Sequence, residues 1–118
     1  MVTKTPLLLA QDVRRLRDSL GLSRERMGRV FGVTAKTIER WESRRGLPTN
    51  DPVRIERLVA AQQITELGTA VYTPEGFAQF LQLPMRVFQG QSALQLMERG
   101  EMETVMGALA SDYEGVGY

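Results

Sequence analysis

Residues 23–45 constrain the fold more than any other stretch, because they combine two short helical patterns with a tight turn between them. Ser23 and Thr34 each precede one of the patterns and are residue types that cap helix N-termini. Gly32 stands between the patterns, where a left-handed residue lets the chain turn. The spacing predicts two short helices joined by a turn that begins at Gly32.

Apolar and basic residues of this stretch fall on opposite sides of the two predicted helices. The buried side is predicted to consist of Met27, Val30, Phe31, Val33, Ile38 and Trp41. The exposed side is predicted to carry Arg24, Arg29, Lys36, Arg40 and Arg44. An aromatic residue near cations is also found where bases stack, but the spacing of Trp41 from Ile38 places it in the core. A helix-turn-helix with outward cations is typical of proteins that bind a polyanion such as DNA.

The remainder of the chain also predicts helices, and no β-branched alternation long enough for a sheet occurs. The expected ranges are about 10–20, 24–31, 35–43, 52 to 71 or 72, 93–99 and 101–112, with a further helix that starts at Pro74 and is ended by Leu83-Pro84. The helices at 52 and 74 are marked by Asp51-Pro52 and Thr73-Pro74, which combine an N-capping side chain with Pro at the first helical position. The helix at 93 is marked by the capping residue Ser92. We therefore expect an all-α fold: a helix-turn-helix bundle followed by a small helical module.

Charge is divided unevenly along the 118 residues, although the net charge is only +1. Residues 1–72 carry 13 Lys/Arg and 8 Asp/Glu, whereas residues 73–118 carry 2 and 6. This asymmetry predicts two parts, 1–72 facing nucleic acid and 73–118 facing another partner. The alternative is that both parts carry ordinary solvated surfaces.

The chain contains no Cys and no His, which removes disulfides, the usual zinc ligands and the commonest general base. We expect no metal, no cofactor and no catalytic residues. Glu98, Glu101 and Glu103 resemble paired carboxylates, but at helix ends they are interpreted as solvated dipole partners. Leu7–Ala10 is too short for a signal peptide or membrane span, so a cytoplasmic protein without membrane contact is expected.

Residues 13–46 resemble the Xre-type helix-turn-helix family of prokaryotic repressors. The matching positions are Arg17, Met27-Gly28, Gly32-Val33-Thr34, Ile38 and Arg40-Trp41-Glu42. The resemblance implies an ion pair between Arg17 and Glu42 that ties the first helix to the third. It also implies that the third helix enters the major groove of operator double-stranded DNA.

The resemblance assigns candidate DNA contacts to both ends of the helix-turn-helix. Lys36 or Arg40 is expected to donate to guanine, and Thr37 to contact a base or a phosphate. Arg24, before the turn, and Arg44 or Arg45, after the third helix, are expected to contact phosphates. The full set of predicted DNA-binding residues is Arg24, Thr34, Lys36, Thr37, Arg40, Arg44 and Arg45.

Residues 73–118 resemble the C-terminal domain of Xre/ParS-like antitoxins, whose cognate toxins belong to the RES-domain group. The matching positions are Phe80-Leu81, Pro84, Gly90, Leu94, Met97, Gly100, Val105, Leu109 and Tyr113-Glu114-Gly115-Val116. This resemblance implies that the C-terminal segment blocks the NAD-binding cleft of the toxin. The predicted toxin-binding residues are Glu114, Gly115, Val116, Gly117 and Tyr118.

Together these resemblances imply a non-enzymatic antitoxin that neutralises a RES-type NAD-degrading or ADP-ribosylating toxin and represses its own operon. A homodimer is expected, because it presents two recognition helices about one DNA turn apart. The alternative is an ordinary Xre-type repressor whose C-terminal half only mediates oligomerisation or a response to a ligand.

Overall fold

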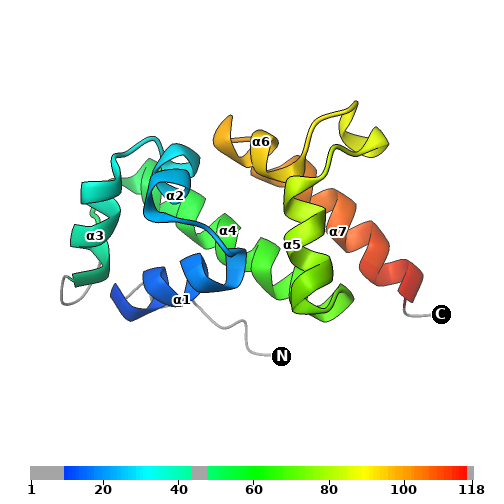
Figure 1. Cartoon of the computed structure of the whole chain (residues 1–118), viewed down its shortest axis with the longest axis horizontal. Helices are drawn as coiled ribbons and strands as arrows, with labels where there is room; N and C mark the ends of the chain where they lie inside the picture. Colours follow the sequence, from blue (N-terminus) through cyan, green and yellow to red (C-terminus); the bar gives the residue numbers. More distant parts are fainter. Residues whose placement is uncertain (1–9, 44–47, 117–118) are drawn as a thin grey trace.

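The structure, a computed structural model, describes residues 10–43 and 48–116, which form an all-α fold as the sequence predicts (Figure 1). The helices are α1 (Ala10–Leu20), α2 (Arg24–Phe31), α3 (Ala35–Ser43), α4 (Pro52–Val71), α5 (Pro74–Gln82), α6 (Ala93–Glu98) and α7 (Met102–Val116). Within the described residues no strand occurs, and the one isolated β-bridge joins Met85 to Gln91. No helix in this part of the chain is both long and apolar enough to cross a membrane.

Local capping explains where α2 and α3 begin and how the chain turns between them. The Ser23 hydroxyl accepts a hydrogen bond from the Arg26 amide at 3.1 Å, which caps α2. Gly32 has a φ of 69°, in the left-handed region, and ends α2. The Thr34 hydroxyl then accepts the Thr37 amide at 3.2 Å, so α3 begins directly after the turn.

Gly28 allows α2 and the turn to approach each other closely. The Val33 amide donates to the Gly28 carbonyl at 2.8 Å. A methyl group added at Gly28 would overlap the carbonyl oxygen of Val33. This close approach to the turn explains why a glycine stands in α2 despite its low helix propensity.

The 20-residue helix α4 begins where Asp51 and Pro52 predict it. The Asp51 carboxylate accepts the Val53 amide at 3.0 Å, and Pro52 occupies the first turn. Figure 1 shows α1, α2 and α3 on one side of the molecule and α5, α6 and α7 on the other, with α4 running from one group to the other. Its buried side chains join a single hydrophobic core that includes residues from both groups.

The connection between α5 and α6 contains an element that the sequence pattern does not predict, the 3-10 turn η1 (Arg86–Phe88). Phe88 is buried and anchors the turn against Phe80, with ring centroids 6.0 Å apart. The Ser92 hydroxyl and the Gln95 side chain then form a reciprocal capping box at the start of α6.

The expected end of the last helix at residue 112 is wrong, because α7 continues to Val116. The Tyr72 hydroxyl donates to the Asp112 carboxylate at 3.0 Å, which ties this part of α7 to the end of α4. No proline interrupts the residues that follow, and one glycine weakens a helix by only about 1 kcal/mol. Thus Glu114, Gly115 and Val116, expected as a tail, belong to a helix.

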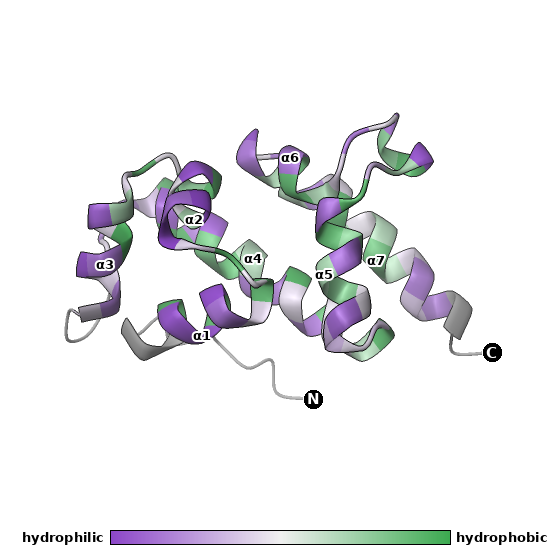
Figure 2. Cartoon of the chain, viewed as in Figure 1, coloured by the Kyte–Doolittle hydropathy of each residue, from purple (hydrophilic) through white to green (hydrophobic). Residues whose placement is uncertain are grey.

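Apolar and hydrophilic segments alternate along the helices in Figure 2, and the apolar residues of the core cluster are buried. Buried residues of α1 to α4 and of α5 to α7 belong to the same core cluster. The division into 1–72 and 73–118 stays a prediction from composition. The continuous core fixes the position of one group of helices relative to the other.

Candidate nucleic-acid interface

Helix α3 has a buried side and an exposed side, as the sequence predicts. Ile38 and Trp41 are buried, with exposed fractions of 0% and 5%. The Trp41 ring packs 6.1 Å from the Phe31 ring, centroid to centroid, at an interplanar angle of 59°. Trp41 is therefore a core residue and has no free face for a nucleic-acid base. Lys36 and Arg40 are exposed.

Three polar side chains of the turn and α3 form a continuous chain of contacts. The Thr34 and Thr37 hydroxyl oxygens are 3.1 Å apart, and either can donate. Arg40 Nη2 donates to the Thr37 hydroxyl oxygen at 3.0 Å. Residues three apart lie beside one another on a helix surface, so this chain runs along one row of α3.

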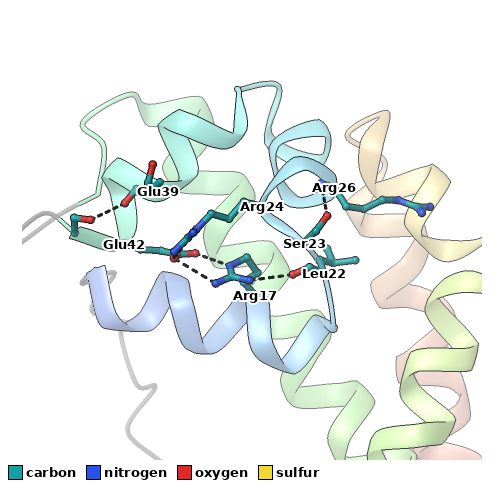
Figure 3. Close-up of polar contacts among 8 residues, drawn as sticks. Arg17, Leu22, Ser23, Arg24, Arg26, Glu39 and Glu42 are labelled. Carbon is teal, nitrogen blue, oxygen red and sulfur yellow. Dashed lines mark hydrogen bonds and ion pairs between the residues drawn. The ribbon is translucent and has the colours of Figure 1, made fainter.

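One carboxylate, that of Glu42, connects three helices (Figure 3). Arg17 of α1 donates from Nε to Glu42 Oε2 at 2.6 Å, which is the ion pair implied by the family resemblance. Arg24 of α2 donates from Nη2 to Oε1 at 2.9 Å and from Nε to the same oxygen at 3.2 Å. Arg17 Nη1 also donates to the Leu22 carbonyl at 3.2 Å. This cluster sets the position of α3 relative to α1 and α2.

The electrostatics of the cluster follow from its burial and its hydrogen bonds. Burial alone raises the pKa of Glu42, but the hydrogen bonds from Arg17 and Arg24 outweigh it and hold the pKa below the ordinary value. The hydrogen bond to Glu42 correspondingly raises the pKa of Arg17. Only 4% of the Glu42 side chain is exposed, so both charges are needed to compensate for its burial.

The sequence did not predict the part that Arg24 plays in this cluster. Its guanidinium contacts Glu42, while 41% of the side chain stays exposed. The contact of Arg24 with phosphate stays a prediction. To make that contact, the Arg24 guanidinium would bind phosphate while it is also paired with Glu42. No local pattern indicates the contact with Glu42, because residues 24 and 42 meet only after the helices have packed.

Glu98, interpreted from the sequence as a solvated charge, contacts two arginines of α2. The Glu98 Oε2 atom lies 3.4 Å from Arg26 Nε and 3.8 Å from Arg29 Nε. These partly exposed pairs connect α2 to α6, although each contributes at most about 1 kcal/mol. Arg57 of α4 adds a bond to the Val30 carbonyl at 3.2 Å, so α2 is held from two other helices.

The other predicted site residues are placed as follows. Thr34 and Thr37 form the polar chain described above, and Lys36 lies on the exposed side of the same helix. Arg44, Arg45, Gly117 and Tyr118 lie outside the described residues. Glu114 is exposed near the end of α7, where Tyr113 is also 51% exposed. Within the described residues, the predicted DNA contacts and the predicted toxin contacts therefore lie in separate groups of helices.

Among the described residues, no group of three or more metal-binding side chains occurs. An open groove of about 630 Å³ lies between α4 and α7, bordered by Val53, Glu56, Arg57, Glu103 and Met106 among others. Its wall mixes apolar and charged side chains.

The chain has an all-α fold in which α2 and α3 are joined by a tight turn and a second group of helices, α5 to α7, shares one core with α1 to α4. The chain is similar to a chain of the M. tuberculosis MbcT–MbcA toxin–antitoxin complex, known from a crystal structure. The TM-score is 0.74 at 20% sequence identity, over 91% of this chain and 95% of the other. This similarity shows a shared fold. No protein-family model and no curated protein sequence matches the chain.

Proposed function

We propose that this chain is an antitoxin that binds a cognate toxin protein and also represses its own operon by binding operator double-stranded DNA. The observation that carries the proposal is the similarity of fold to a chain of a toxin–antitoxin complex, which extends over nearly the full length of both chains. A shared DNA-binding subdomain alone would give a similarity limited to the first helices.

The exposed side of α3 supports the DNA-binding part of the proposal. Lys36 and Arg40 extend from a helix whose other side is held in the core by Ile38 and Trp41. Such a helix can enter the major groove without loss of its packing. The excess of basic residues in 1–72 favours the approach of this side to the phosphate backbone.

The second group of helices supports the toxin-binding part. Residues 73–118 are acidic overall, and Tyr113 and Glu114 are exposed near the end of α7. We propose that the toxin is of the RES type and that Glu114 to Tyr118 dock at its NAD-binding cleft. In this account the antitoxin blocks the toxin sterically and catalyses no reaction itself.

The proposed repressor is a homodimer. Two copies related by a two-fold axis present two α3 helices to adjacent major grooves, about 34 Å apart along the DNA. An inverted repeat in the operator is the sequence that such a dimer recognises.

Co-purification tests the proposal directly. The chain is co-expressed with the product of the neighbouring open reading frame, with an affinity tag on only one of them. The expected result is a stable complex that elutes as one species and also shifts a duplex from the promoter region. A neighbouring product that forms no complex, together with intact DNA binding, would instead favour an ordinary repressor with a C-terminal oligomerisation or ligand-response module.

A further inference from the structure

We propose that Thr37 is a positioning residue for Arg40, so that Arg40 reads a guanine in the operator and Thr37 acts through it without contacting a base itself. This inference rests on the proposed DNA binding, and it replaces the expected contact of Thr37 with a base or a phosphate by a role in positioning Arg40. It is carried by the polar chain Thr34–Thr37–Arg40 on the outer side of α3.

The first step concerns how Thr37 is itself held. Its backbone amide donates to the Thr34 hydroxyl at 3.2 Å, and its hydroxyl oxygen lies 3.1 Å from the same atom. A hydroxyl offers one donor and two acceptor positions. Whichever hydroxyl donates in this pair, Thr37 therefore keeps a lone pair for Arg40.

The second step concerns the restriction of Arg40. Arg40 is exposed, and a free arginine side chain samples many rotamers. Thr37 is β-branched and belongs to the first turn of α3, so its own χ1 has few accessible values. The 3.0 Å bond from Arg40 Nη2 to this fixed hydroxyl restricts the guanidinium before DNA is bound. Binding then loses less conformational entropy.

The third step concerns what remains available for recognition. The bond to Thr37 uses one N–H of the Arg40 guanidinium, and a pair of N–H groups on neighbouring nitrogens stays available. Such a pair matches the O6 and N7 acceptors of guanine. The Thr37 hydroxyl, in contrast, already uses two of its three hydrogen-bonding positions for Thr34 and Arg40. Arg40 is thus the reader, and Thr37 determines where it points.

The test is a double-mutant cycle with a duplex selected from a randomised pool by the unaltered protein, and a second duplex of unrelated sequence. The variants are Thr37→Val, which keeps the shape without the hydroxyl, Thr37→Ser, which keeps the hydroxyl, Arg40→Ala, and the double variant Thr37→Val/Arg40→Ala. Circular dichroism and thermal unfolding of each variant verify the fold.

We expect Thr37→Val to weaken binding of the selected duplex by about 2- to 12-fold, the range of one net hydrogen bond. Thr37→Ser should retain most of the affinity. Binding of the unrelated duplex should not change with Thr37→Val, because phosphate contacts do not depend on the direction of Arg40. In the Arg40→Ala background, Thr37→Val should have no further effect, since the group that it positions is absent.

One result would contradict only the positioning role of Thr37, and another would contradict DNA binding itself. Additive losses from Thr37→Val and Arg40→Ala would show that Thr37 acts independently of Arg40, and would overturn the inference while leaving DNA binding intact. Failure of the unaltered protein to enrich or bind any duplex would overturn the proposed DNA-binding function and this inference with it.

Discussion

Arg17 Nε lies 2.6 Å from Glu42 Oε2, and this contact ties the first helix to the end of the third. The same carboxylate receives Arg24 at 2.9 Å, so one acidic residue links α3 to both α1 and α2. Helix α3, which this cluster links to α1 and α2, exposes Lys36 and Arg40 on its other side. The ion cluster therefore supports the proposed DNA-reading surface without being part of it.

Replacement of Glu42 tests the stability of this cluster. Glu42→Ala leaves two guanidinium groups facing each other and should lower the free energy of unfolding by about 3 kcal/mol. Urea titration monitored by circular dichroism measures the change. Glu39→Gln removes an exposed carboxylate from the same helix and is the matched control, for which a change below about 0.5 kcal/mol is expected. Equal effects of both substitutions would contradict a structural role for Glu42.

The lowered pKa of Glu42 predicts a dependence of stability on pH. A carboxyl group with a pKa lower in the folded than in the unfolded state contributes its full stabilisation above its ordinary value of 4.5. This stabilisation is lost as the pH falls through the folded-state pKa. The unfolding free energy of Glu42→Gln should therefore fall less between pH 6 and pH 3 than that of the unaltered chain. Parallel pH profiles would contradict this assignment.

Substitution by alanine should have opposite effects on the stability of the fold at Gly28 and at Gly107. Gly28→Ala places a methyl group against the Val33 carbonyl oxygen and should destabilise the fold by about 1–3 kcal/mol. Gly107→Ala, in α7, meets no described atom within 4 Å and should instead stabilise the fold by up to about 1 kcal/mol. Thermal unfolding of both variants gives the comparison. A Gly28→Ala variant as stable as the unaltered chain would contradict the close approach of α2 to the turn.

The sequence assigns guanine recognition to Lys36 or Arg40; with Arg40 proposed as the guanine reader, we propose that Lys36 contacts phosphate and acts on all DNA sequences alike. Lys36→Ala should weaken binding to any duplex by a similar factor and reduce the slope of log K against log salt by about 1. Fluorescence anisotropy over a series of salt concentrations measures this slope. Arg99→Ala is the matched control, because Arg99 is an exposed cation beside α6 that pairs with Glu101. A slope that changes equally in both variants would argue against α3 as the DNA-facing helix.

Removal of residues 114–118 separates the two proposed partners. The truncation keeps the buried Leu109 and the bond between Tyr72 and Asp112, so the fold should be retained. DNA affinity should stay within about 2-fold, a difference of about 0.4 kcal/mol, whereas inhibition of the purified toxin should be lost or greatly reduced. Gln79→Ala, an exposed change on α5, serves as a control that should inhibit normally. Full inhibition by the truncated chain would place the toxin contact elsewhere.

The sequence predicts most helix starts because capping is local. Ser23, Thr34, Asp51, Thr73 and Ser92 each accept a backbone amide a few residues ahead, and residue type and spacing are sufficient to indicate such contacts. The apolar spacing likewise predicts the buried positions of Ile38 and Trp41, which the structure confirms.

Contacts between distant segments are what the sequence pattern does not predict. The turn η1 depends on burial of Phe88 against Phe80, and the pairing of Glu98 with α2 depends on how the two groups of helices pack. The position of Arg24 at Glu42 and the continuation of α7 past residue 112 have the same origin. The apolar spacing does not predict the polar chain on α3 either. The spacing of Thr34, Thr37 and Arg40 by three residues does indicate it, because such residues are neighbours on a helix surface.

Growth of cells that express the neighbouring open reading frame tests the central claim most directly. Expression of that product alone should arrest growth, and co-expression of this chain should restore it. The variant Lys36→Ala/Arg40→Ala should restore growth equally well when expressed from an independent promoter, because neutralisation does not require DNA binding. Normal growth with the neighbouring product alone, or arrest that persists when this chain is present, would contradict the assignment as an antitoxin.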